Sequence, residues 1–288
     1  MAEAGVTLFT LWFHFLPVTR RMVASGDLHT DKLQLHHLGA RRRWSGREKH
    51  MLPILAEGAQ ELGVDLSAEQ LERFQTYYEV LTDWAERVSL TAVKDEEGIQ
   101  KRHFLESIAL IPVLEEEGLS LTDKSLIDIG SGAGIPGIPL KIVDPTIKLT
   151  LVEAKQRKAE FLSALLKELE IDDVVVIPRR SEETAHNPIH REQYNFAAAK
   201  ALAPLSTLIE LTLPFLVMGG VLIAPKGKDT DKEVAEADVA LETLKGAIRH
   251  VGPIPLADNK QKVVLVDKDL PTPARFPRRP GMPAKRPL

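Results

Sequence analysis

A cluster of glycines that follows a carboxylate is the part of this sequence whose residue types and spacing could bind a cofactor. Glycine lets the backbone turn sharply and approach a ligand without a Cβ in the way, and a helix after such a turn begins with unpaired N–H groups. An apolar run and Asp128 precede the cluster and apolar residues follow it, so we predict a strand, a ligand-binding turn and a helix. The glycines are Gly130, Gly132, Gly134 and Gly137.

Two kinds of nucleotide cofactor fit this turn. Gly132, Gly134 and Gly137 satisfy the G-x-G-x-x-G pattern of dinucleotide-binding folds, whereas the glycines from 130 to 134 give G-x-G-x-G preceded by Asp128. A carboxylate beside a pyrophosphate is unfavourable in a partly desolvated cleft, but S-adenosylmethionine carries an ammonium and a sulfonium group and no phosphate. The charge therefore favours S-adenosylmethionine, held by Gly130, Gly132, Gly134 and Asp128. An NAD(P)-dependent oxidoreductase is the alternative.

Polar residues also follow the second and third predicted strands. Glu153 lies about 20 residues past the glycine turn, where an acidic side chain accepts hydrogen bonds from ribose hydroxyls. Both cofactors contain a ribose, so Glu153 does not separate them. Ser181 and Glu182 could meet an adenine ring and its exocyclic amine, although a surface loop with an N-capping serine would give the same pattern.

Two further residues are candidates for positioning a substrate. Lys200 ends the fourth predicted strand, and ligands of such sheets bind beyond the carboxyl ends of the strands. It could bind a nucleic-acid phosphate or the cofactor carboxylate, or simply extend its ammonium into water. His103 and Ser107 are four residues apart and share a helix face, which ordinary amphipathic helices also do. We name His103 and Lys200 as positioning candidates, and no residue as a certain catalyst.

Absent residue types narrow the chemistry. The sequence has no cysteine, which excludes disulfides, thiolate metal sites and the cysteine nucleophile that cytosine C5 methylation needs. No metal-binding pattern is present, and Lys200–Pro204 lacks the Asn/Asp-Pro-Pro-aromatic signature of amino-group methylation. An atom that is already nucleophilic remains, such as guanine N7, whose in-plane lone pair needs no general base. The protein would contribute alignment and a suitable electrostatic environment.

Alternating strand and helix patterns place these residues in an α/β fold. We predict a doubly wound, largely parallel sheet of seven strands, the Rossmann-like arrangement of a methyltransferase, with an N-terminal helical extension. The strands are expected at 125–129, 148–153, 173–178, 194–200, 220–225, 249–254 and 261–267, with helices at 137–143, 156–169, 203–217 and 229–246. A helix from 96 to 117 and one opened by a capping box at Ser67 precede them. The predicted domains are 1–50, 51–120, 121–270 and 271–288.

Charge is distributed unevenly along the chain. The net charge is −4, yet residues 1–50 and 271–288 are both basic, so any polyanion would meet the ends rather than the acidic body. Residues 1–50 are read as a poorly ordered extension whose apolar run is too short to span a bilayer. Residues 271–288 are read as an extended basic arm laid along RNA, with Phe276 stacking. Removal of 275–288 should weaken RNA binding and leave cofactor affinity intact. The RNA-binding candidates are Arg275, Phe276, Arg278, Arg279, Lys285 and Arg286.

Several motifs together resemble one protein family. The chain is similar to the RsmG (GidB) family of bacterial small-subunit ribosomal RNA guanine-N7 methyltransferases, over about residues 51–288. The matching stretches are Leu90–Ala92, His103–Ser107, Asp128–Leu140, Arg157-Lys158, Phe161-Leu162, Arg180–Glu183, Ala201–Leu205, Lys226-Gly227 and Arg275–Leu288.

The resemblance implies a cofactor, a substrate and a cellular setting. It implies S-adenosylmethionine held by Gly130, Ile135, Ser181, Glu182 and the cation after the fourth strand. It also implies a guanine of 16S ribosomal RNA as substrate, on naked RNA or on the small subunit, and a monomeric cytoplasmic enzyme without a membrane partner. The family usually has arginine where this chain has Lys200, so the bidentate fork of arginine is missing there.

Overall fold

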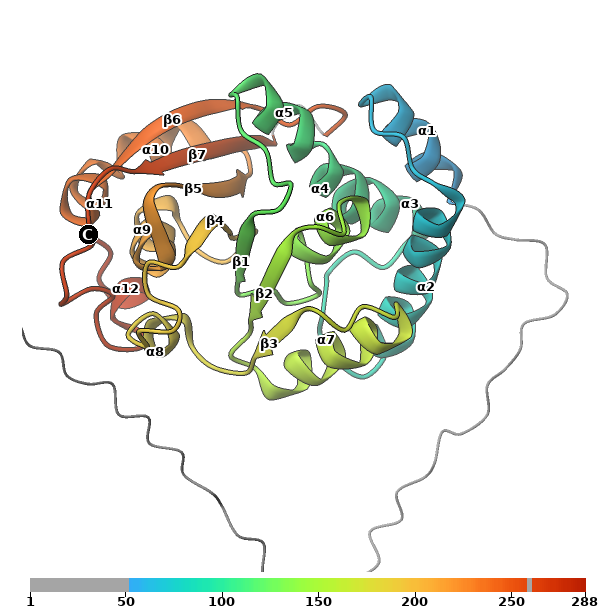
Figure 1. Cartoon of the computed structure of the whole chain (residues 1–288), viewed down its shortest axis with the longest axis horizontal. Coiled ribbons are helices and arrows are strands. Elements are labelled where there is room, and N and C mark those ends of the chain that lie inside the picture. Colours follow the sequence, from blue (N-terminus) through green and yellow to red (C-terminus); the bar gives the residue numbers. More distant parts are fainter. Residues whose placement is uncertain (1–51, 258–260) are drawn as a thin grey trace, which may run out of the picture. The chain divides into compact units, whose positions relative to one another are not determined.

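A seven-stranded mixed sheet forms the centre of the part of the chain that the computed structural model describes, residues 52–257 and 261–288 (Figure 1). The strand order is β3-β2-β1-β4-β5-β7-β6, and β7 is antiparallel to both of its neighbours. The parallel order reverses direction beside β1, which places the carboxyl ends of β1 and β4 next to each other. The predicted fold class and the closing pair of strands are confirmed. The strands are β1 (Ser125–Ile129), β2 (Lys148–Val152), β3 (Val175–Ile177), β4 (Tyr194–Ala198), β5 (Leu216–Lys226), β6 (Gly246–Pro253) and β7 (Lys262–Lys268).

Each face of the sheet packs against its own layer of helices. Successive strand residues point to opposite faces, so Leu126 of β1 packs with α2, α6 and α7, whereas Ile127 packs with α9 and α11. Figure 1 shows these two groups of helices on opposite sides of the strands. The longer helices are α1 (Pro53–Glu61), α2 (Ala68–Ala85), α5 (Leu110–Glu116), α6 (Gly137–Val143), α7 (Gln156–Glu168), α9 (Leu205–Thr212), α10 (Thr230–Ala235) and α11 (Asp238–Leu244).

The helices before the sheet belong to the same hydrophobic core as the strands. Phe74 and Tyr77 of α2 are fully buried in the cluster that contains Leu126. The capping box is confirmed: the Gln70 amide donates to Ser67 Oγ at 3.2 Å, and the Ser67 amide donates to Gln70 Oε1 at 2.8 Å. The predicted separation of 51–120 from the sheet stays a prediction. Residues 1–50, which were predicted as a separate N-terminal extension, lie outside the described residues.

Three predicted helices are subdivided. The helix expected over 96–117 contains a π-helical segment, η1 (Gln100–Leu105), between α3 (Glu96–Ile99) and α4 (Glu106–Ile108). The helix expected over 203–217 ends at Thr212, because Pro214 lacks the N–H that would continue it and a 3₁₀ turn follows. The helix expected over 229–246 is divided into α10 and α11. Within the described residues, no helix is both long and apolar enough to cross a membrane.

The C-terminal segment is folded onto the body, so the prediction of an extended arm is wrong. Phe276 is 4% exposed and packs in the core beside α9, so it is not free to stack on a base. The Arg191 guanidinium donates to the carbonyl oxygens of Phe276 and Thr272 at 2.8 and 3.0 Å. A short helix, α12 (Met282–Lys285), follows and lies near α9 and α8 (Ser181–Thr184) (Figure 1). Spacing alone missed this because proline-rich backbone has no periodic signal.

Candidate functional site

A cavity of about 410 Å³ opens beyond the carboxyl ends of the parallel strands. Ligands bind at this edge in open α/β sheets, and small-molecule sites commonly measure roughly 300–1,000 Å³. The lining comes from the glycine turn, the ends of β1 and β2, α8, the loop after β4, and the C-terminal segment. The lining residues are Ile129, Gly130, Val152, Glu153, Ala154, Lys155, Lys158, Arg180, Ser181, Glu182, Ala201, Leu202, Ala203, Thr207, Leu211, Gly281, Pro283 and Ala284.

The glycine turn adopts a backbone that only glycine adopts without strain. Gly130 has φ +69°, and a Cβ there would lie 2.7 Å from Cδ1 of Leu202. Gly134 has φ +88°, and a Cβ there would lie 2.6 Å from Cδ1 of Ile138 and 3.0 Å from the Tyr77 hydroxyl. That hydroxyl donates to the Ala133 carbonyl within the turn. A side chain of α2 therefore supports the turn from beneath.

Asp128 lies under the turn rather than beside a ligand. Its carboxyl is fully buried, Oδ2 accepts the Gly137 amide at 3.0 Å, and Oδ1 has no hydrogen-bond partner among the described residues. Burial raises the pKa of Asp128 to about 7, with the nearby Glu153 charge as a smaller contribution. Asp128 does not line the cavity. The predicted repulsion between Asp128 and a pyrophosphate is therefore wrong, and Asp128 instead fixes the start of α6.

Glu153 occupies the position that the sequence predicted for it. It is 7% exposed and lines the cavity. One oxygen accepts the Gly132 amide at 3.0 Å and the other accepts the Lys155 amide at 2.7 Å. Each carboxylate oxygen has a second lone pair. Glu153 can therefore bridge the glycine turn and the hydroxyl groups of a ligand.

Ser181 and Glu182 line the cavity from the start of α8. Ser181 Oγ donates to the Leu211 carbonyl at 3.2 Å, so this serine does not cap the helix and that alternative is wrong. Glu182 Oε1 accepts the Gly281 amide at 2.8 Å. Val152 and Pro283 also line the cavity, which makes the lining mixed apolar and polar, as an adenine ring with an exocyclic amine requires.

A cluster of polar side chains lies beside the cavity, at the end of β4. Lys200 Nζ donates to Glu106 Oε2 at 2.7 Å and to the Arg102 carbonyl at 2.5 Å. His103 Nε2 lies 2.6 Å from Thr91 Oγ1, and its Nδ1 has no partner among the described residues. Burial and the Lys200 charge lower the pKa of His103 to about 4, and burial lowers the pKa of Lys200. The sequence pattern did not foresee that η1 brings His103 and Lys200 together.

The predicted cofactor contacts divide into three groups. Those that line the cavity are Gly130, Glu153, Ser181 and Glu182. Gly132 is linked to the cavity through Glu153, whereas Asp128, Gly134, Ile135 and Lys200 are not part of its lining. The cavity also contains residues that we did not predict as contacts, namely Lys155, Lys158, Arg180, Leu202, Gly281 and Pro283. Lys158 and Arg180 follow β2 and β3 closely, so strand-end position was the signal that could have found them.

The RNA-binding candidates also divide. Arg275, Arg279, Lys285 and Arg286 are exposed. The Arg275 guanidinium carbon lies 5.1 Å from the centre of the Phe276 ring, and Arg278 is paired with the buried Glu210. The four exposed residues remain available to a polyanion.

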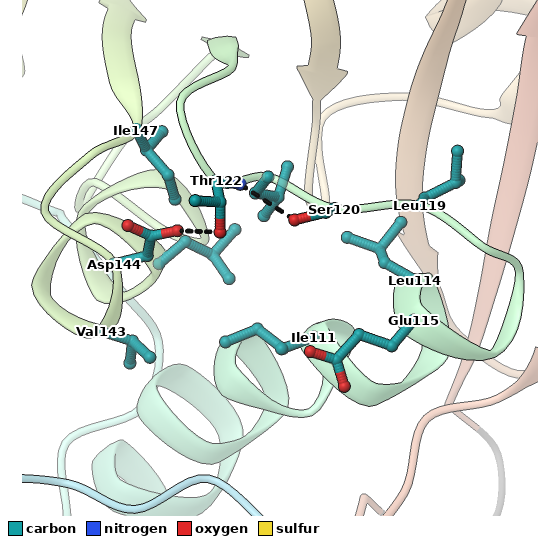
Figure 2. Close-up of a pocket in the computed structure, with 11 residues that line it drawn as sticks. Ile111, Leu114, Glu115, Leu119, Ser120, Thr122, Val143, Asp144 and Ile147 are labelled. Carbon is teal, nitrogen blue, oxygen red and sulfur yellow. Dashed lines mark hydrogen bonds between the residues drawn. The ribbon is translucent and has the colours of Figure 1, made fainter.

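A second cavity, of about 160 Å³, lies at the other edge of the sheet (Figure 2). Leu121 and Thr122 precede β1, and Asp144 and Ile147 precede β2, so this cavity lies at the amino ends of the strands. Figure 2 shows apolar side chains around it and the Thr122 hydroxyl bonded to Asp144, at 2.8 Å. It offers little polar chemistry to a ligand, and the larger cavity is the candidate site.

Comparison with known proteins gives consistent matches. The family model described as "GidB: rRNA small subunit methyltransferase G" matches residues 70–264. The "Ribosomal RNA small subunit methyltransferase G" of Dehalococcoides mccartyi is 42% identical over 236 residues, covering 81% of this chain and 98% of the relative. That of Acetivibrio thermocellus is 38% identical over 244 residues, covering 84% and 98%. A solved SAM dependent methyltransferase from Aquifex aeolicus is 16% identical, with a TM-score of 0.44, covering 60% of this chain and 98% of that one.

Proposed function

This chain belongs to the GidB family, rRNA small subunit methyltransferase G, and from that premise we propose that it methylates guanine N7 in 16S ribosomal RNA with S-adenosylmethionine as the methyl donor. The observation that carries the proposal is the cavity at the carboxyl ends of β1 and β2, which Glu153 and Glu182 line and which has the Lys200 cluster beside it. We further propose that it acts in the cytoplasm as a monomer.

The residues of the cavity fit this cofactor. Glu153 suits ribose hydroxyls, and Glu182 suits an exocyclic amine, because ionised carboxylates only accept hydrogen bonds. Lys155, Lys158 and Arg180 supply cations for the cofactor carboxylate. A Cβ on Gly132 would lie 3.9 Å from Lys158 Nζ, so that cation is close to the turn. When bound, S-adenosylmethionine supplies an electrophilic methyl group on a sulfonium sulfur.

The cluster beside the cavity suits a guanine that becomes positively charged at N7. Methyl transfer to this nitrogen removes no proton, so a group that titrates near neutral pH is not needed. His103 is neutral above about pH 4, and Glu106 balances the charge of Lys200, so the cluster adds little net positive charge beside the base. Nδ1 of His103 is buried and has no hydrogen-bond partner among the described residues, so a bond from it to the base edge would require the ring to turn outward. We assign His103 and Lys200 to orienting the guanine.

The π-helical segment supports this assignment. A π-turn inserts an extra residue into a helix and is frequent at functional sites. Here η1 carries His103, and Glu106 follows it directly. The loop from Lys200 to Pro204 comes from β4, and its Ala201 has φ +53°, a strained value for a residue with a Cβ. The two irregular segments meet through the Lys200–Glu106 pair.

The test is to map N7-methylguanine in ribosomal RNA from cells with and without the gene. The proposal requires one 16S guanine to lose the modification without the gene and regain it when the gene is restored. Purified protein should bind S-adenosylmethionine and not NADH in calorimetry. Binding of NADH would instead support the oxidoreductase. RNA binding without methyl transfer to naked RNA or to the small subunit would support a non-catalytic module.

A further inference from the structure

The C-terminal segment, residues 272–288, is part of the cavity that the glycine turn opens. Gly281, Pro283 and Ala284 line the cavity together with Glu153 and Glu182. Two hydrogen bonds join the segment to other lining residues: the Gly281 amide donates to Glu182 Oε1 at 2.8 Å, and the Thr207 hydroxyl donates to the Pro283 carbonyl at 3.2 Å. The segment is therefore bonded to the side chains that face the ligand.

An ion pair with α9 helps to hold the part of this segment that lines the cavity. Glu210 of α9 is 1% exposed, and its carboxylate accepts four hydrogen bonds from Arg278: from the amide at 2.7 Å, from Nε at 2.9 and 3.1 Å, and from Nη2 at 2.6 Å. Fork-like arginine–carboxylate contacts are among the strongest and most directional in proteins. Nη2 also donates to the Arg286 carbonyl at 2.8 Å, which ties the two ends of the segment together.

The neighbouring arginines have opposite surroundings. Arg278 is half-buried against Glu210, whereas Arg279 is exposed. Both are cations in a basic segment, so from sequence they were equivalent candidates for RNA contact. Their surroundings distinguish them: Arg278 can affect the cavity, whereas Arg279 can contact a polyanion.

We propose that residues 272–288 form a wall of the cofactor cavity beside Glu182, and that Arg278, through Glu210, is a positioning residue for cofactor binding. The inference rests on the proposed function, because it takes the occupant to be S-adenosylmethionine. If Arg278 is lost, the segment loses its ion pair with α9 and keeps only the Thr207–Pro283 hydrogen bond and the packing of Phe276 there, so the Gly281 amide moves away from Glu182 more readily and the cavity opens beside Glu182. This corrects the expectation that the segment does not affect cofactor affinity.

Calorimetry with S-adenosylhomocysteine, the stable product form of the cofactor, tests the proposal on the full-length protein. Arg278→Ala should raise the Kd about tenfold, because apparent affinity falls in proportion to the fraction of molecules with the segment docked. The Kd of Arg278→Lys should lie between those of the wild type and Arg278→Ala, since lysine keeps the positive charge but not the two-pronged guanidinium. Arg279→Ala is the matched control, with an unchanged Kd for the cofactor.

A second variant guards against simple misfolding. Arg278→Ala leaves Glu210 as a buried carboxylate without its partner, which can destabilise the fold. Arg278→Met combined with Glu210→Gln removes both charges together, so it should unfold near the wild-type temperature and still bind the cofactor weakly. Removal of 275–288 should weaken binding at least as much.

Proteolysis of the wild-type protein measures whether the cofactor protects the segment, which would not be expected if the segment were only structural. Trypsin can cleave after Arg275 and Lys285, and S-adenosylhomocysteine should slow both cuts severalfold, because binding and docking of the segment stabilise each other reciprocally. Unchanged Kd values in Arg278→Ala, in the double variant and in the protein without residues 275–288, or a cleavage rate that does not change with the cofactor, would overturn the proposal and leave the proposed function standing. Failure of the wild-type protein to bind the cofactor would overturn the function itself.

Discussion

Replacement of Asp128 by asparagine should remove a large pH dependence of stability. The folded protein holds a proton on this buried carboxyl up to about pH 7, whereas the unfolded chain releases it near 3.8. Between these pH values the folded state binds more protons, so the free energy of unfolding falls as the pH rises. Raising a carboxyl pKa from 3.8 to about 7 corresponds to roughly 4 kcal/mol, at about 1.4 kcal/mol per pH unit.

Asparagine keeps the shape and an oxygen that can accept the Gly137 amide, but it does not titrate. We expect the stability of Asp128→Asn relative to the wild type to increase by about 4 kcal/mol between pH 4 and pH 8. Urea unfolding of both proteins at each pH measures this difference, and other titrating groups cancel in it. A difference that stays constant across this range would refute the reasoning, because it would mean that Asp128 is ionised in the folded protein at pH 4.

Three further perturbations test the site. Tyr77→Phe should lower the free energy of unfolding by about 1–3 kcal/mol, because the Ala133 carbonyl loses its buried donor. It should also weaken cofactor binding. Tyr78→Phe is the neighbouring control, and equal effects of the two substitutions would contradict the role of Tyr77. Lys200→Met combined with Glu106→Gln should leave the Kd for the cofactor near the wild-type value but lower the single-turnover rate of methyl transfer by on the order of tenfold or more. An unchanged rate would contradict the assignment of Lys200 to orienting the guanine. Arg279→Ala with Lys285→Ala should reduce the slope of log K against log salt for RNA by about 1.4, if each contacts one phosphate; an unchanged slope would mean that neither does.

Much of the sheet could be predicted from sequence because its signals are local. Apolar runs of strand length alternate with helical patterns, and the glycines mark the turn after β1, so the strand positions and the place of Glu153 followed from general rules. Strand-end position also led to Ser181 and Glu182. These residues reach the cavity because the fold places the carboxyl ends of parallel strands at one edge.

What sequence could not predict depends on partners that are distant in the chain. The acidic character of Asp128 was visible, but its burial beneath the turn depends on how α2 and α6 cover it. In the sequence, Arg278 is one of five basic residues in the C-terminal segment, and nothing local indicates that it pairs with Glu210, 68 positions earlier. The pairing of Lys200 with Glu106 needs both the η1 irregularity and the adjacency of β4 to β1. Local patterns contain no information about such contacts.

The bond between the Gly281 amide and Glu182 also has a consequence for how the protein is made. It joins residues 99 positions apart, and the glycine turn is synthesised earlier still. A nascent chain on the ribosome therefore has the sequence of its glycine turn long before residues 281–284 are added to close the cavity. If these residues complete the cavity, a ribosome that stops before codon 281 produces a chain that has every strand of the sheet but binds the cofactor weakly. Readiness to methylate would then depend on translation reaching residues 281–284.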